Sequence, residues 1–176
     1  MQTTQWIVIT GAPCSGKTCV IDALARRGHR VKPEVARAYI DAEMGRGRTL
    51  AQVRADEAAF ERHILYAKRE IEAALPPDEP IFFDRAVPDS IAYFRLAGLD
   101  TAEPLALSRR FAYRRIFLFD RLALDRDRVR VEDDRAAALL DVYLEEAYRG
   151  LGYEPLRVPL LAVGGRVAFI LTHLQP

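Results

Sequence analysis

The sequence predicts a three-layer α/β sandwich built on a parallel sheet, and three observations indicate this class. Short apolar runs rich in β-branched residues alternate along the chain with longer segments of helical character. Glycine or proline stands at many of the breaks between these segments. The 176 residues suffice for one domain with a sizeable core. Parallel strands joined by helices require right-handed crossovers, so ligands are expected at the carboxyl ends of the strands.

The first half of the chain begins with its clearest strand. Residues 6–10, Trp-Ile-Val-Ile-Thr, form a continuous apolar run, which is typical of a strand buried on both faces. The elements predicted after it are helix 18–27, strand 29–32, helix 35–44 and helix 53–75. In the last of these, apolar residues recur at spacings of seven, four, seven and four and form one stripe: Val53, Phe60, Ile64, Ile71 and Leu75.

The second half of the chain continues the alternation. Its predicted elements are strand 81–83, helix 88–96, strand 115–119, helix 136–148, strand 156–158 and helix 167–174. Pro88 suits the first turn of its helix, and Gly98 ends that helix. Residues 121–134 are too charged to pack inside, and we expect a mobile loop there. Because no repeat or linker divides the chain, residues 1–176 are expected to form a single domain.

Charge and cysteine content exclude several classes of protein. Lys+Arg 26 against Asp+Glu 25 leaves a net charge of +1, so no global field attracts the chain to a nucleic acid polymer or a membrane. Cys14 and Cys19 fit neither a zinc site nor a disulfide framework and are expected to be reduced. No secretory signal is seen, and no window approaches the ~18 apolar residues of a membrane span. We therefore expect a soluble, cytoplasmic protein.

A glycine-rich motif connects the first strand to the first helix. It fits G-x-x-x-x-G-K-[ST] with the residues Gly11, Ala12, Pro13, Cys14, Ser15, Gly16, Lys17 and Thr18. The glycines let successive backbone N–H groups converge on an anion, and the helix N-terminus adds partial positive charge. Lys17 is expected to reach the β- and γ-phosphates of ATP, and the Thr18 hydroxyl to coordinate Mg²⁺. The alternative, a glycine-rich turn that binds nothing, is disfavoured because motif, strand and helix coincide. Cys19, directly after the motif, is counted with the nucleotide-binding residues but has no catalytic role.

An acidic and a basic residue follow the strand at 81–83. Asp84 is placed to hold the metal through water or to accept a proton from an attacking hydroxyl. The planar guanidinium of Arg85 suits bidentate binding of a phosphate or carboxylate. The alternative is that Asp84 and Arg85 serve only to cap the helix that follows them. The glycine-rich motif favours a catalytic role for both residues.

Three further residues are candidates for binding a phosphate acceptor. Glu34 follows the strand at 29–32, and Arg37 lies on the same face of the next helix. Glu34 is either a base that serves a substrate hydroxyl or an acid favoured by the helix dipole with a local salt bridge. Asp89 lies in the first turn after Pro88, where the dipole alone also explains an acid.

The charged segment at 121–134 presents several guanidinium groups. The alternating run at 126–130 contributes Arg126, Arg128 and Arg130 as catalytic candidates. Phosphoryl transfer depends on neutralising the charge of the transferred group, so we expect at least one of the three to reach phosphate. Arg121 is counted with the nucleotide-binding residues. The alternative is a solvated charge run neutralised by its own acidic residues.

The motifs together resemble a known family. The segments GAPCSGKT, Pro33-Glu34-Val35-Ala36-Arg37, FFDRAVPDS and DRDRVRVEDD are similar to those of small stand-alone P-loop proteins of the AAA-type ATPase-domain family. These proteins resemble nucleoside and nucleotide kinases, including ribosylnicotinamide-kinase-like and deoxynucleoside-kinase-like groups, more than hexameric AAA machines. The resemblance extends over nearly the whole chain. It implies a P-loop NTPase fold with a five-stranded parallel sheet in the order 2-3-1-4-5, a lid at about residues 121–134, and an acceptor pocket after strands two and three.

The resemblance also implies roles for individual residues. In deoxynucleoside kinases a Glu after the second strand acts as base, and an acid-Arg-Ser motif after the third strand holds metal and substrate. Glu34 and the pair Asp84-Arg85 match these in type. Two departures are that Ala86 replaces the serine and that Asp89 is one position closer than the corresponding acid.

The sequence therefore predicts an ATP- and Mg²⁺-dependent phosphotransferase that moves the γ-phosphate of ATP to a small metabolite. A nucleoside or nucleotide is the first candidate acceptor. The alternatives are an ATP-binding switch that controls a partner protein, and a kinase of a sugar, an antibiotic or a cell-wall precursor. We expect a monomer or homodimer that binds neither a nucleic acid polymer nor a membrane.

Overall fold

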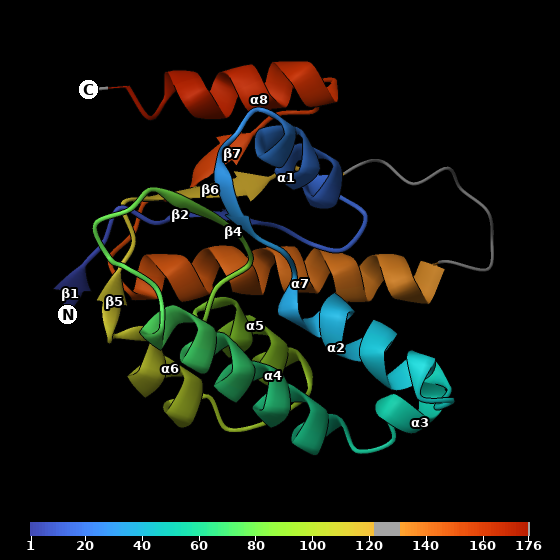
Figure 1. Cartoon of the computed structure of the whole chain (residues 1–176). Coiled ribbons are helices and arrows are strands. Elements are labelled where there is room, and N and C mark those ends of the chain that lie inside the picture. Colours follow the sequence, from blue (N-terminus) through green and yellow to red (C-terminus); the bar gives the residue numbers. More distant parts are fainter. Residues whose placement is uncertain (122–130, 176) are drawn as a thin grey trace.

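A five-stranded parallel sheet forms the centre of the computed structural model (Figure 1). The structure describes residues 1–121 and 131–175, with only the backbone described at 131–134. The strands lie in the order β3 (Arg30–Lys32), β4 (Ile81–Asp84), β2 (Ile7–Thr10), β6 (Arg115–Phe119) and β7 (Leu156–Val158). Counted along the chain within this sheet, these are the second, third, first, fourth and fifth strands. The predicted α/β class is confirmed.

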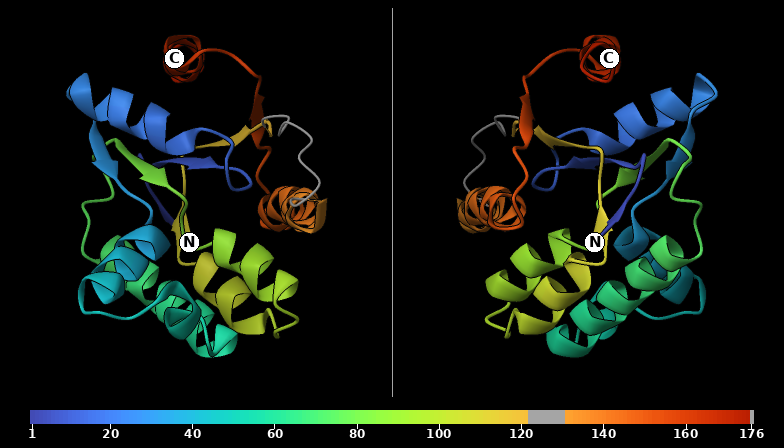
Figure 2. Two further views of the ribbon diagram at one scale, coloured as in Figure 1. Left: turned by 90° about the vertical axis from the view of Figure 1, so that its right-hand side faces the viewer. Right: turned by 90° about the vertical axis from the view of Figure 1, so that its left-hand side faces the viewer.

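Helices cover both faces of the sheet, as the end views of Figure 2 show. They are α1 (Lys17–Arg26), α2 (Val35–Gly45), α3 (Leu50–Val53), α4 (Glu57–Ala73), α5 (Asp89–Leu96), α6 (Ala102–Ser108), α7 (Val131–Gly150) and α8 (Val163–Thr172). Ile7 and Ile9 pack in the core formed with α1 and α8. Trp6 and Val8 pack on the opposite face with Tyr148 of α7. Because side chains alternate along a strand, the two helical layers bury β2 on both faces.

The carboxyl ends of β2 and β4 bring two predicted site segments together. Ile9 pairs with Asp84 in the sheet register, so β4 ends beside the loop that precedes α1. The Arg85 N–H then donates to the Ile9 carbonyl at 3.0 Å. Asp84, Arg85 and the glycine-rich loop therefore share one edge of the sheet, where parallel α/β folds bind ligands.

The helix predicted over 53–75 is divided in the structure. α3 ends at Val53 and has its own capping box, while α4 begins at Glu57. The Asp56 carboxylate caps α4 by accepting a hydrogen bond from the Ala59 N–H at 2.9 Å. An apolar stripe does not reveal such a break, because local capping bonds decide it.

Other boundaries also differ from the prediction. α7 begins at Val131, so the expectation of a loop is wrong for residues 131–134; residues 122–130 lie outside the described part of the chain. α8 begins at Val163, four residues earlier than predicted. Helix α6 and the paired strands β1 (Gln2–Thr3) and β5 (Phe111–Ala112) are additional, because elements this short carry little periodicity. Within residues 1–121 and 131–175, no helix has both the length and the apolar character needed to cross a membrane.

Candidate functional site

The loop between β2 and α1 takes a shape that requires glycine at two positions. Gly11 has φ +143°, and a Cβ there would lie 2.9 Å from the carbonyl oxygen of Phe119. Gly16 has φ +82°, in the left-handed region. Cys14 adopts a positive φ of 59° between them. The backbone therefore turns tightly before it enters α1, as the glycine-rich motif predicts.

The backbone amides of this loop point to an anion as ligand. The N–H groups of Cys14, Ser15 and Gly16 donate to no acceptor within the described part of the chain. They directly precede α1, whose N-terminus carries partial positive charge. Successive unpaired N–H groups at a helix N-terminus form a concavity that binds phosphate.

The Lys17 side chain folds back across the same loop. Its ammonium group donates to the carbonyls of Gly11 and Ala12, each at 2.9 Å, and to Ser15 Oγ at 3.0 Å. Burial, followed by the nearby charge of Arg85, lowers the pKa of Lys17 from 10.5 to about 7. An anion bound in the loop would raise that pKa again, because an opposite charge favours the ammonium form.

Two oxygen ligands lie next to the loop. The Thr18 hydroxyl donates to Asp84 Oδ2 at 3.4 Å, and the other carboxylate oxygen, Oδ1, is buried without a hydrogen-bond partner. Burial is the main cause that raises the pKa of Asp84 from 3.8 to about 6. A hydroxyl and a carboxylate are donors that Mg²⁺ prefers, and a bound cation would stabilise the charged carboxylate. The two residues therefore fit a magnesium ion.

Arg85 and Glu34 meet beside this pair. Arg85 is buried and has a positive φ of 66°, which is uncommon for a residue other than glycine. Its Nε lies 3.2 Å from the Tyr93 hydroxyl and 3.5 Å from Glu34 Oε1, and its Nη1 is buried without a partner. Glu34 precedes α2 but makes no capping bond with its side chain. Both alternatives for Glu34, a base and an acid favoured by the helix dipole with a local salt bridge, are compatible with this geometry, and the salt bridge is made with Arg85.

The Asp89 carboxylate is hydrogen-bonded to groups inside the protein. Its carboxylate accepts hydrogen bonds from the hydroxyls of Thr10 and Tyr148 and from the Ala86 N–H, the last at 2.9 Å. The side chain is fully buried. These internal donors occupy both oxygens, so the structure favours the non-substrate alternative for Asp89.

Of the remaining predicted residues, Cys14 lies within the loop and Cys19 lies in the first turn of α1. Arg37 is exposed on α2 and makes no ion pair with Glu34 among the described side chains. Cys14 and Cys19 are free, exposed thiols. Arg121 is partly buried at the end of the described segment. The predictions for Arg126, Arg128 and Arg130 fall on residues outside the described ranges.

Arg166 of α8 supports the loop from a distant part of the sequence, and sequence reasoning missed it. Its guanidinium donates to the Ser15 carbonyl and lies over the Phe119 ring at 5.1 Å. It is also the group that a Cβ at Gly16 would approach, at 3.1 Å. The only sequence signal is an arginine inside an otherwise apolar helix, which does not identify its contact.

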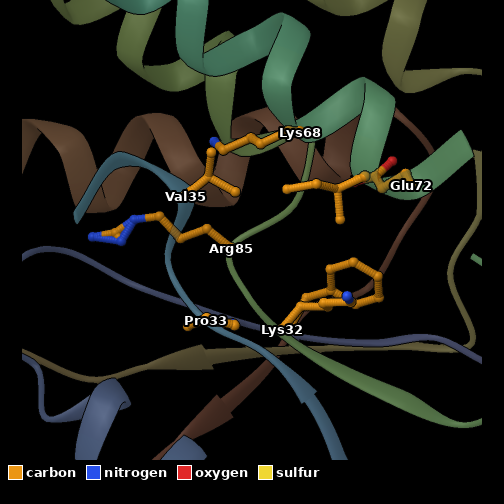
Figure 3. A pocket seen from close by; sticks show the side chains of 8 residues that line it. Lys32, Pro33, Val35, Lys68, Glu72 and Arg85 are labelled. Carbon is orange, nitrogen blue, oxygen red and sulfur yellow. The ribbon is translucent and has the colours of Figure 1, made fainter. Parts of the chain in front are cut away.

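A small pocket lies between β3, β4 and α4 (Figure 3). It is lined by the segments after two strands, as the family resemblance implies, and also by α4, which sequence reasoning did not include: Lys32, Pro33, Val35, Lys68, Ile71, Glu72, Phe83 and Arg85. The available signal was charge on the buried side of α4. Glu61, Lys68 and Glu72 are all buried there among the apolar residues.

Comparison with known proteins identifies a family and a fold. A family described as an AAA domain matches residues 6–165. A comparison with curated proteins found no match.

Three solved structures illustrate the shared fold. The crystal structure of NadR protein in complex with NR matches with a TM-score of 0.69 at 17% identity, over 96% of this chain and 50% of that chain, so this chain spans about half of its length. Deoxyadenosine kinase from M. mycoides matches at 0.60 and 16% identity, over 96% of this chain and 97% of that one. Thymidylate kinase from Ehrlichia chaffeensis matches at 0.68 and 13% identity, over 99% and 100% of the two chains. At these identities the likeness shows the fold.

Proposed function

The chain belongs to the AAA-domain family, and from that premise we propose that it is an ATP-dependent phosphotransferase whose acceptor is a small metabolite, with nucleosides and nucleotides as first candidates. One observation carries the proposal: unpartnered loop amides and the Lys17 ammonium lie next to the oxygen pair of Thr18 and Asp84. Amides and a lysine bind phosphate oxygens, and the oxygen pair suits the metal that accompanies a polyphosphate. The names of two structures with the same fold, a deoxyadenosine kinase and a thymidylate kinase, support this class of reaction.

The loop residues bind and neutralise the donor. The amides of Cys14, Ser15 and Gly16 bind phosphate oxygens, and Lys17 exchanges its bonds to loop carbonyls for bonds to the terminal phosphates. Thr18 and Asp84 would hold Mg²⁺, which when bound neutralises charge on the phosphates. Asp84 is thereby assigned to the metal and not to the acceptor proton.

Glu34 and Arg85 act on the acceptor side. Glu34 is partly exposed, with 25% of its side chain accessible, and it lies beside the buried Arg85. Glu34 accepts the proton of an acceptor hydroxyl, while Arg85 stabilises the negative charge of the group in transfer. An acceptor that is already a monophosphate needs no strong base.

Sequence grounds alone support two further parts of the proposal. Residues 1–176 form one domain, and Arg126, Arg128 and Arg130 approach the phosphates during transfer. Replacing these three arginines together by alanine is expected to lower turnover without changing the thermal unfolding temperature.

The test is a screen for ADP release from ATP and Mg²⁺ in the presence of nucleosides, nucleoside monophosphates or sugars. The proposal expects release that depends on a nucleoside or nucleotide. Hydrolysis that no acceptor stimulates would instead favour a nucleotide-dependent switch. Calorimetry adds a direct check, because Lys17→Ala should abolish ATP binding while Lys32→Ala, outside the loop, should leave it. Unchanged ATP affinity in Lys17→Ala would refute the phosphate-binding loop.

A further inference from the structure

The pocket of Figure 3 has an unusual charge balance. Three basic side chains belong to its wall, namely Lys32 from β3, Lys68 from α4 and Arg85 from the segment after β4. Its one acidic residue is Glu72 of α4. Lys68 and Arg85 are both buried, at 4% and 5% exposure. Low-dielectric walls strengthen the field of such charges, so the pocket attracts anions.

The Lys68 ammonium has too few partners for its depth. Its one hydrogen bond in the described part of the chain goes to Ser90 Oγ, at 3.2 Å. No described carboxylate lies within the 4.0 Å of an ion pair. Burial lowers the pKa of Lys68, and the charges of Asp89 and Glu61 offset this effect only in part. A buried cation with one neutral partner costs free energy in the protein alone.

The acidic side chains around Lys68 are engaged elsewhere. Glu72 accepts hydrogen bonds from a backbone N–H at 2.9 Å and from the Tyr113 hydroxyl at 2.8 Å. Asp89 accepts from three internal donors, as described above. The Glu61 carboxylate lies 3.9 Å from the Arg54 guanidinium. None of these carboxylates forms an ion pair with the lysine, although the charges of Asp89 and Glu61 act on it from a longer distance.

Arg85 has a similar unused capacity. Its Nε side is occupied by the Tyr93 hydroxyl and Glu34, but Nη1 is buried without a partner. Two buried cations from separate elements thus line one pocket, each with N–H donors that the protein does not use. An anionic oxygen group supplies both the missing charge and the missing acceptors.

We propose that this pocket binds an anionic group of the phosphate acceptor, a phosphate monoester or a carboxylate, between Lys68 and Arg85, and that Lys68 selects anionic over neutral acceptors. This rests on the proposed function, because the acceptor is the second substrate of the phosphotransferase. The charge of Arg85 acts on the side chains of Asp84 and Lys17, so a group bound to Arg85 lies near the oxygen pair of Thr18 and Asp84. Lys68 is a specificity-determining residue for that acceptor.

The first measurement separates this role from a structural one. Lys68→Met keeps the length of the side chain and removes the charge, so its thermal unfolding temperature without ligand should equal or exceed that of the native protein. A lysine that held α4 to α5 through Ser90 would instead destabilise the fold when replaced. Clear destabilisation or failure to fold in both Lys68→Met and Lys68→Gln would overturn the proposal, because Gln keeps a donor for Ser90.

The second measurement tests anion binding with the phosphate-binding loop saturated by AMP-PNP and Mg²⁺. Calorimetry then compares nucleoside monophosphates, inorganic phosphate and a carboxylate probe, citrate, with the corresponding neutral nucleosides. Lys68→Met should weaken binding of the anionic probe that fits by roughly tenfold or more and leave neutral nucleosides unaffected. Lys32→Met is the matched control, since Lys32 is only half-buried in the same wall, and it should change affinity much less.

The probes distinguish a phosphate ligand from a carboxylate ligand. A phosphate site binds nucleoside monophosphates and inorganic phosphate, whereas a carboxylate site binds citrate. Equal affinity of native protein and Lys68→Met for every anion would overturn the proposal. If the proposed function itself is wrong, the native protein will not bind AMP-PNP, and this result is distinguishable from failure of the pocket proposal. The anion titrations are then repeated without AMP-PNP in a Lys17→Ala background, and loss of anion binding on adding Lys68→Met still supports the pocket.

Discussion

The Thr18 hydroxyl donates to the Asp84 carboxylate across 3.4 Å and joins the start of α1 to the end of β4, although 66 positions separate the two residues. The contact exists because β4 is the parallel neighbour of β2, from which the loop before α1 emerges. Parallel pairing puts the carboxyl ends of both strands at the same edge. The two oxygen ligands proposed for the metal are thereby positioned by backbone pairing, independently of any ligand.

Replacing Asp84 should affect turnover more than nucleotide affinity. Asp84→Asn keeps the shape of the side chain but removes the negative charge that would hold Mg²⁺ in transfer, so kcat should fall by roughly a hundredfold. Binding of ATP depends mainly on the loop amides and Lys17, and its Kd should change by less than about tenfold. Steady-state kinetics with calorimetry check both values. Full activity in Asp84→Asn would remove this residue from the chemistry.

Replacing Arg166 should weaken nucleotide binding from outside the loop. The guanidinium donates to the Ser15 carbonyl and is 3% exposed. Without it, the loop amides lose a support, and Arg166→Met should weaken AMP-PNP binding by about tenfold or more. Arg166→Lys, which keeps a donor, should recover part of the affinity. Arg149→Met on the exposed face of α7 is the control, and an equal effect of both Met variants would contradict the role of Arg166.

Replacing Gly11 tests the tight approach of the loop to β6. A Cβ would lie 2.9 Å from the Phe119 carbonyl oxygen, a backbone atom that has little room to move. Gly11→Ala should lower the free energy of unfolding by roughly 2–4 kcal/mol. Gly45 at the end of α2 meets nothing within 4 Å, so Gly45→Ala should be within about 1 kcal/mol of the native protein. Urea denaturation of both variants makes the comparison.

The raised pKa of Glu72 predicts that the stability of the protein depends on pH. Burial is the main cause that raises the pKa of Glu72 from 4.5 to about 7. Between these values the folded state holds a proton that the unfolded state has released, so stability falls as pH rises from 4.5 to about 7. Glu72→Gln removes this titration, and its unfolding free energy relative to the native protein should increase over that range by at most about 3 kcal/mol. Parallel pH profiles for the two proteins would show that Glu72 does not carry the effect.

Several candidate site residues, which the structure brings together, could be picked out from the sequence because their signal is local. The eight-residue motif from Gly11 to Thr18 contains the glycines, the lysine and the hydroxyl in one short stretch, after a strand and before a helix. Asp84 and Arg85 follow their strand directly, and the register of β2 and β4 places them beside that motif. A pattern a few residues long is enough when the chemistry itself occupies a few residues.

Other residues could not be assigned because their roles depend on distant partners. Asp89 looked suitable for a substrate, but Thr10 and Tyr148 come from β2 and α7 to occupy it. Lys68 belongs to no sequence motif, and its burial follows from the packing of α4 against α5. Burial and pairing of this kind cannot be obtained from spacing along the chain.

By itself, the amino-acid sequence determined the α/β class, the approximate places of the sheet strands and the glycine-rich loop with Lys17 and Thr18. These follow from periodicity and from backbone conformations that neighbouring residues impose. Only the tertiary structure decided that Asp89 is internal, that Arg166 supports the loop and that Lys68 shares a pocket with Arg85. The physical reason is that solvation and hydrogen-bond partners of a side chain are set by the segments that pack around it.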